Sequence, residues 1–199
     1  FSLVLGIFAL NPNYYLARPL PTNDGYTWTL ASRLGAMLRE IENLYGERDK
    51  SWTFVGVEFE IGGPQIWFPG NCGNIAIQLN INALYNEVLA HYQLAHEVIH
   101  LLAPDSNRGA PNIEEGLATV YSEDFVMREH RVSNLTTMAS YIEVAKSVRE
   151  LLDFDGESIK KLRTVEPSFK RMTVGTFKSA NLAYPEDKVA YLLSAFVRE

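Results

Sequence analysis

The spacing of apolar residues predicts a mixed first part of the chain and a helical second part. Leu30, Leu34 and Met37 recur at three- and four-residue intervals. This spacing predicts a helix over about 29–45, which Gly46 can end. Beyond that glycine the apolar residues partly alternate with polar ones, as they do in strands. Strand-like runs lie at about 52–61, 65–68 and 74–80.

From about residue 83 onward the apolar spacing is helical, with breaks such as Pro104. The expected helices lie at about 83–102, 112–130, 135–152, 158–165 and 186–197. Residues 11–13 and 18–25 are rich in turn-forming residues and are expected to be irregular. The apolar opening, residues 1–10, is shorter than the about 20 residues of a membrane helix. We expect a buried strand or a short helix there.

These elements predict one α+β domain over residues 1–199, built from two lobes. Residues 1–103 would hold the sheet and one long helix, and residues 104–199 would hold the remaining helices. The formal net charge is −6 and there is no run of lysine and arginine, which argues against a nucleic-acid partner. No segment has the length and apolarity of a membrane span. The pattern does not indicate an oligomeric state.

The chain has a single cysteine, Cys72, so an internal disulfide and a cysteine-based metal cluster are both excluded. A metal site must therefore use histidines and carboxylates. A cytoplasmic location agrees with this cysteine content. Export remains open, because the chain begins at Phe1 and a preceding segment is expected.

The segment His96-Glu97-Val98-Ile99-His100 carries the strongest chemical signal in the chain. Histidines four residues apart on a helix leave the axis about 40° from one another, so both rings can reach one metal ion. Glu97 follows the first histidine and can take a proton from water at the open position of the metal. The motif therefore predicts a zinc site, with one Zn²⁺ per chain and Glu97 as general base.

A catalytic zinc site usually has three protein ligands, and the segment 112–119 offers two carboxylates, Glu114 and Glu115. The sequence Glu115-Gly116-Leu117-Ala118, after the histidine motif, resembles the third-ligand helix of the gluzincin metallopeptidases, such as thermolysin and the aminopeptidase N-like enzymes. This resemblance implies that Glu115 is the third ligand and that the fold is zincin-like. Helical geometry favours the same residue, because its face carries the small side chains of Ala118, Thr119 and Ser122.

The same resemblance implies further parts of a peptidase site. The segment 183–191 is similar to a helix start in the aminopeptidase-like enzymes, where a tyrosine hydroxyl stabilises the transition state, and this implies a catalytic role for Tyr184. The strand expected at 74–80 would run along the cleft and pair with an extended substrate. Ser122 or Glu123 would orient a ligand histidine. An amine-gripping segment typical of aminopeptidases is replaced by residues 70–74.

The predicted function is therefore a zinc metallopeptidase that acts on a peptide or protein substrate. One alternative is a zincin-fold binding or regulatory module with little or no proteolytic activity. The other is an accidental motif on an unrelated scaffold, and zinc content would distinguish it.

Overall fold

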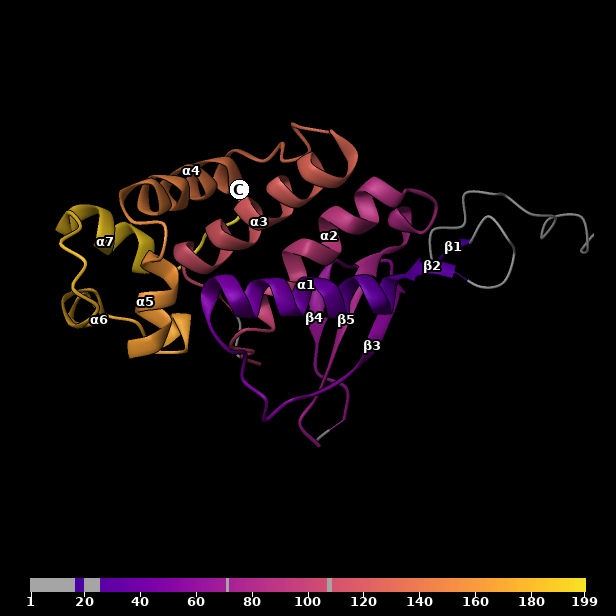
Figure 1. Ribbon diagram of the computed structural model, residues 1–199, viewed down its shortest axis with the longest axis horizontal. Coiled ribbons are helices and arrows are strands. Elements are labelled where there is room, and N and C mark those ends of the chain that lie inside the picture. Colours follow the sequence, from indigo (N-terminus) through magenta and orange to yellow (C-terminus); the bar gives the residue numbers. More distant parts are fainter. Residues whose placement is uncertain (1–16, 20–25, 71, 107–108) are drawn as a thin grey trace, which may run out of the picture.

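The computed structural model describes residues 17–19, 26–70, 72–106 and 109–199, which form an α+β fold (Figure 1). The strands are β1 (Ala17–Pro19), β2 (Tyr26–Thr29), β3 (Thr53–Glu60), β4 (Gln65–Trp67) and β5 (Asn74–Asn80). The α-helices are α1 (Leu30–Tyr45), α2 (Glu87–His100), α3 (Asn112–His130), α4 (Ala139–Phe154), α5 (Ser158–Val165), α6 (Val174–Ser179) and α7 (Glu186–Leu193). Two 3-10 helices are η1 (Ile81–Tyr85) and η2 (Phe169–Arg171).

The main sheet has three strands in the order β3-β5-β4. Strand β5 is central, runs parallel to β3 and pairs antiparallel with β4. Its apolar side chains Ile75, Ile77 and Leu79 are almost fully buried. Among the described strands β4 is paired only with β5, and its other edge lies next to the site described below. Strands β1 and β2 form a separate antiparallel pair.

Helices α1 and α2 pack against the main sheet, and α3 and α4 follow in order away from it (Figure 1). The core between α1, β5 and α2 contains Met37, Ile41, Leu94 and Val98, each at most 1% exposed. Burial of these side chains is the main source of stability for this arrangement. The central position of α2 fixes the histidine motif against the sheet on one side and against α3 on the other.

Helices α3 and α4 approach each other closely at Gly116. A Cβ atom at this position would lie 2.5 Å from the carbonyl oxygen of Val144 and 2.6 Å from Cγ2 of Val148. Both distances are shorter than real contacts, so only glycine fits without displacing α4. The glycine of the Glu115-Gly116 pair thus has a packing role.

Replacing Gly116 by alanine is expected to destabilise the fold by about 1–3 kcal/mol, because the new methyl group overpacks the contact between α3 and α4. The matched control is Gly35→Ala in α1, where the nearest atom to the new Cβ is 3.8 Å away. That change is expected to stabilise the protein by about 0.5–1 kcal/mol through helix propensity. Urea unfolding of both variants measures the effects. Equal effects of the two changes would contradict the close approach at Gly116.

Most of the expected elements are present, and several bounds need correction. The helix expected at 83–102 is divided into η1 and α2, because the Asn86 side chain accepts a hydrogen bond of 3.0 Å from the Leu89 backbone and caps a new helix. The helix expected at 135–152 begins later, at Ala139. The expectation of irregular structure at 18–25 is wrong at its start, where β1 pairs with β2. The expectations for residues 1–10 and 11–13 lie outside the described residues.

The last expected helix, at 186–197, ends early because the chain beyond it forms other bonds. Helix α7 ends at Leu193, and the next residues are extended. Ala195 pairs with Pro111 in an isolated antiparallel bridge. The Phe196 backbone donates a hydrogen bond of 2.9 Å to the carbonyl of Ala110. The segment 194–199 is therefore attached to the start of α3, close to the candidate metal ligands.

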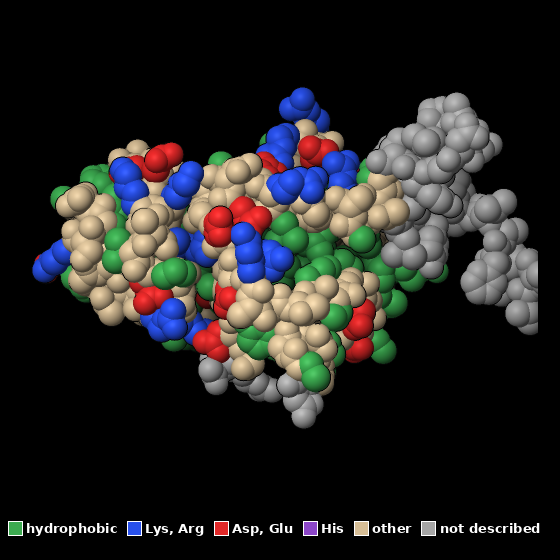
Figure 2. Space-filling view, turned by 60° about the horizontal axis from the view of Figure 1, so that its bottom comes forward, with side chains coloured by type: hydrophobic (Ala, Val, Ile, Leu, Met, Phe, Trp, Pro, Cys, Tyr) green, Lys and Arg blue, Asp and Glu red, His purple; other side chains and the backbone are tan. Residues whose placement is uncertain are grey.

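In the part of the chain that the structure describes, no helix is both long and apolar enough to cross a lipid bilayer. Lysine and arginine side chains lie in several separate groups on the face shown in Figure 2, with aspartate and glutamate beside them.

Candidate metal centre

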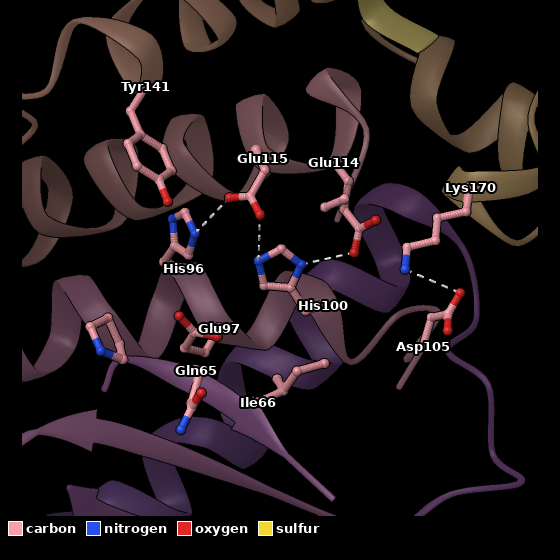
Figure 3. Close-up of a pocket in the computed structure, with 12 residues that line it drawn as sticks. Gln65, Ile66, His96, Glu97, His100, Asp105, Glu114, Glu115, Tyr141 and Lys170 are labelled. Atoms are coloured by element: carbon pink, nitrogen blue, oxygen red, sulfur yellow. Dashed lines mark hydrogen bonds and ion pairs between the residues drawn. The ribbon is translucent and has the colours of Figure 1, made fainter. Parts of the chain in front are cut away.

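Helix α2 presents three residues of the histidine motif toward α3 and β4. The rings of His96 and His100 leave the same side of the helix, with their centroids 5.4 Å apart. Glu97 is 4% exposed and lies below the two rings, next to β4 (Figure 3). The geometry expected from the four-residue spacing is therefore present.

Helix α3 brings Glu115 to both histidines. Its Oε2 atom lies 3.3 Å from Nε2 of His96, and its Oε1 atom lies 3.9 Å from Nε2 of His100. The ligand atoms of these three residues all lie within 4.8 Å of one another, so they could hold a metal ion. Glu115 Oε2 is buried and accepts no hydrogen bond from the described residues. A buried oxygen that faces a ring nitrogen without a hydrogen bond fits a cation between the two atoms.

Glu114 fixes the orientation of the second histidine. Its Oε1 atom is 2.8 Å from Nδ1 of His100, and both side chains are buried (Figure 3). A proton on Nδ1 that is donated to this carboxylate leaves Nε2 of His100 with a lone pair directed at Glu115. Glu114 thus acts on the metal site through the histidine.

The expectation that Ser122 or Glu123 would orient a histidine is not met. The Ser122 hydroxyl donates a hydrogen bond of 2.8 Å to the carbonyl of Thr119, and Glu123 pairs with Arg149 at 2.9 Å. Glu114 performs this role instead, and sequence reasoning considered it only as a neighbour of Glu115. Two adjacent carboxylates at the first turn of a helix were the available signal.

The pKa values of Glu97, His100 and Glu115 are all shifted by burial and by the charges of their neighbours. Burial raises the pKa of Glu97, while His100 and His96 act in the opposite direction. Burial disfavours charge on His100, but Glu115 and Glu114 outweigh this effect and raise its pKa to about 10. Burial also opposes charge on Glu115, yet His100 and His96 lower its pKa to about 2. Without a metal the proton thus resides on His100, and a bound cation would replace that proton.

A pocket opens in front of these residues and contains a tyrosine from a third helix. Tyr141, near the start of α4, directs its hydroxyl toward His96 and Glu115 (Figure 3), and its ring centroid is 5.8 Å from that of His96. At the far end of the pocket, Nζ of Lys170 lies 3.2 Å from Oδ2 of Asp105.

The strand along this pocket is β4 and not the one expected from the sequence. Gln65 and Ile66 of β4 line the pocket, and the Ile66 backbone donates a hydrogen bond to Glu97. The expectation that residues 74–80 would pair with a substrate is wrong, because β5 is already paired on both sides. The short apolar run 65–68 gave no sign of this position.

The structure does not bring Tyr184 to the candidate metal ligands. Its ring packs on Phe154, with centroids 5.3 Å apart, and Lys188 lies 5.8 Å above it. It lines a separate hollow between α4 and α7. Tyr141 is the tyrosine beside His96, and no motif in the sequence marked it. Its place depends on the packing of α4 on α3, which residue spacing alone does not define.

A second group of side chains could also hold a metal ion. It consists of Glu87 and His91, one turn apart on α2, and His130 at the end of α3. Nδ1 of His91 is 2.7 Å from Nε2 of His130, which is a hydrogen-bond distance. His91 also contacts the rings of Trp28 and Phe125. A structural role for His91 accounts for these contacts.

No protein-family model, curated protein or solved structure matches this chain.

Proposed function

We propose that this protein is a zinc-dependent peptidase with a zincin-like fold, of the gluzincin type. The observation that carries the proposal is the convergence of His96, His100 and Glu115, from two helices, on one point beside a buried Glu97. Two imidazoles and one carboxylate, with room for one further ligand, form the donor set of catalytic zinc sites. The pocket in front of them supplies that room.

Beside the three ligands, Glu97, Tyr141 and Glu114 have defined tasks in peptide hydrolysis. Zinc, when bound, supplies a Lewis acid that lowers the pKa of water to about 7. Glu97 takes a proton from the attacking water and delivers it to the leaving amine, and the raised pKa of its buried carboxyl suits this exchange. Tyr141 donates a hydrogen bond to the oxygen that becomes negative as the carbonyl is attacked. Glu114 keeps the His100 ring in place.

The substrate would lie along the free edge of β4. The backbone groups of Gln65 and Ile66 border the pocket, and an extended peptide can pair with such an edge. The Ile66 backbone also bonds to Glu97, so substrate and general base are positioned by the same strand.

The test of this proposal is the metal content of the purified protein, measured by elemental analysis. We expect about one zinc ion per chain, and a large loss of zinc in Glu115→Ala, because two remaining ligands hold the ion poorly. The matched control is Glu123→Ala on the same helix, whose carboxylate pairs with Arg149 instead. A metal-replete preparation that holds no zinc would overturn the proposal. Equal zinc content in the wild type and both variants would exclude Glu115 as a ligand.

Replacing Tyr141 by phenylalanine is expected to lower kcat by about 10²–10³-fold, the usual effect of removing one oxyanion donor. Zinc content should not change, because Tyr141 lies beside the ligands and is not one of them. The control is Tyr184→Phe, whose ring lies in a different hollow, and its kcat should equal that of the wild type. A fall in kcat only in Tyr184→Phe would show that Tyr184, and not Tyr141, stabilises the negative oxygen.

A further inference from the structure

A second hollow continues the candidate active site past His96 along α2. It shares His96, Glu97 and Tyr141 with the pocket described above, and each hollow has a volume of about 210 Å³. The metal ligands therefore lie between two spaces of similar size. A peptide that lies across the metal would fill both of them, one on each side of the bond to be cleaved.

The two spaces differ in their chemistry. The side chains that line the second hollow include Leu89, Leu135 and Met138, all of them only partly buried. Such partly exposed apolar side chains gain stability when an apolar ligand covers them. The second hollow is therefore suited to an apolar side chain of the substrate.

The balance of acidic and basic side chains also differs between the two spaces. The first pocket carries Asp105, Glu114 and Glu115 in addition to the shared Glu97, with Lys170 as its basic residue. Apart from Glu97, the charged residue that lines the second hollow is Arg198. A negatively charged end of a substrate meets one basic and one acidic side chain in the second hollow, against four acidic side chains and one basic side chain in the first pocket. The second hollow is therefore the more favourable of the two for a carboxylate.

The ring of Tyr141 lies between Arg198 and the metal ligand His96. Its Cζ atom lies 5.9 Å from the centroid of the Tyr141 ring, and that ring lies 5.8 Å from the ring of His96. Arg198 is solvent-exposed, and its charge acts on Glu115, whose pKa it helps to lower. The Tyr141 ring also packs on Phe196, at 4.7 Å, so the same segment positions both the tyrosine and the arginine.

We propose that the second hollow binds the carboxyl-terminal residue of a peptide, with an apolar side chain against Leu89, Leu135 and Met138 and the free carboxylate on Arg198. This inference rests on the proposed peptidase function and defines its substrate class. Arginine binds carboxylates through a planar fork of donors, which suits this task. The short path from Arg198 to His96 places the last peptide bond of the substrate, and not an internal one, at the metal.

The reaction is the hydrolysis of that last bond. The carbon–nitrogen bond breaks and water adds its hydroxyl to the acyl carbon. The remaining proton of the water passes through Glu97 to the leaving nitrogen. The products are a shortened peptide with a new carboxylate and a free apolar amino acid.

The test compares acetyl-Ala-Ala-Leu as the free acid and as its carboxamide. We expect the wild type to cleave the acid with a kcat/KM at least about tenfold above that of the amide, because only the acid can form a charge-assisted hydrogen bond with Arg198. The variant Arg198→Gln should lose this preference, through slower cleavage of the acid alone. Arg39→Gln, a change on the exposed face of α1, should behave as the wild type.

Binding to the Glu97→Gln variant, measured by calorimetry, separates this inference from the proposed function. The free acid should bind at least about tenfold more weakly when Arg198→Gln is added to that variant. Equal, Glu97-dependent cleavage of acid and amide would overturn this inference and leave the peptidase proposal intact. The opposite result is also distinguishable: the acid binds in an Arg198-dependent way, but the zinc-loaded wild type cleaves no peptide. That result would overturn the peptidase proposal, while the inference that Arg198 binds a carboxylate would stand.

Discussion

Replacement of Glu97 by glutamine is expected to lower kcat for peptide hydrolysis by about 10²–10⁴-fold, the usual contribution of a general base, while the zinc content stays the same. Glutamine has the size of glutamate but cannot accept a proton from water. Glu97 is buried next to the ligands, and its carboxylate is not one of the three groups that converge on the metal position. Single-turnover kinetics together with elemental analysis measures both quantities on the same sample.

The control for this change is Glu143→Gln on the exposed side of α4, which should keep full activity. Normal turnover by the Glu97 variant would show that the proposed mechanism is wrong. A wild type that holds zinc but cleaves no member of a broad peptide library would favour the alternative function, a zincin-fold binding or regulatory module.

Replacement of Arg163 by methionine is expected to destabilise the protein by about 3–5 kcal/mol, because several carbonyls lose a charged donor at once and each buried polar group left unsatisfied costs about 1–3 kcal/mol. Arg163 is 4% exposed and donates hydrogen bonds to five backbone carbonyls. These carbonyls belong to Tyr45, Gly46, Glu47, Leu102 and Pro167. Burial lowers the pKa of Arg163 to about 10, so the group is still charged at neutral pH.

The reason for so large an effect is that one guanidinium joins the ends of two helices. The carbonyls at the end of α1 and the carbonyl just after α2 have no further helical partners. Methionine fills similar space but removes all five donated bonds, and with them the donor to the buried carbonyl of Tyr45. The Leu102 carbonyl keeps its bond of 2.9 Å from the Asp49 backbone. Urea unfolding measures the change, and the control Arg171→Met removes an exposed pair with Glu166 and should cost less than about 1 kcal/mol. Similar midpoints for the two variants would contradict this account.

The sequence predicted the parts of the site that lie within single helices. The spacing of His96 and His100 is a property of one helix, so their common direction follows from helical geometry alone. The bounds of α3 follow from the apolar pattern over 112–130, and Glu115 lies on the face expected from its small neighbours. The sequence also predicted the three strands of the main sheet, within one or two residues.

The rest depends on contacts between elements that residue spacing does not encode. Tyr141 is next to His96 only because Gly116 lets α4 approach α3 closely. Strand order is likewise a tertiary property: three strands in sequence do not reveal that β5 lies between the other two. Glu114 and Glu115 are adjacent in the sequence, and the contact of Glu114 with Nδ1 of His100 depends on the position of α2 beside α3.

The attachment of residues 194–199 beside the pocket affects how the protein should be handled in the laboratory. Phe196 packs on Tyr141, and the Glu199 backbone donates a hydrogen bond of 3.4 Å to the Ser140 hydroxyl. Any segment joined after Glu199, such as an affinity tag, would begin next to Arg198, which lines the second hollow. Purification tags for activity measurements therefore belong at the opposite end of the chain, or should be removed by a protease before any assay.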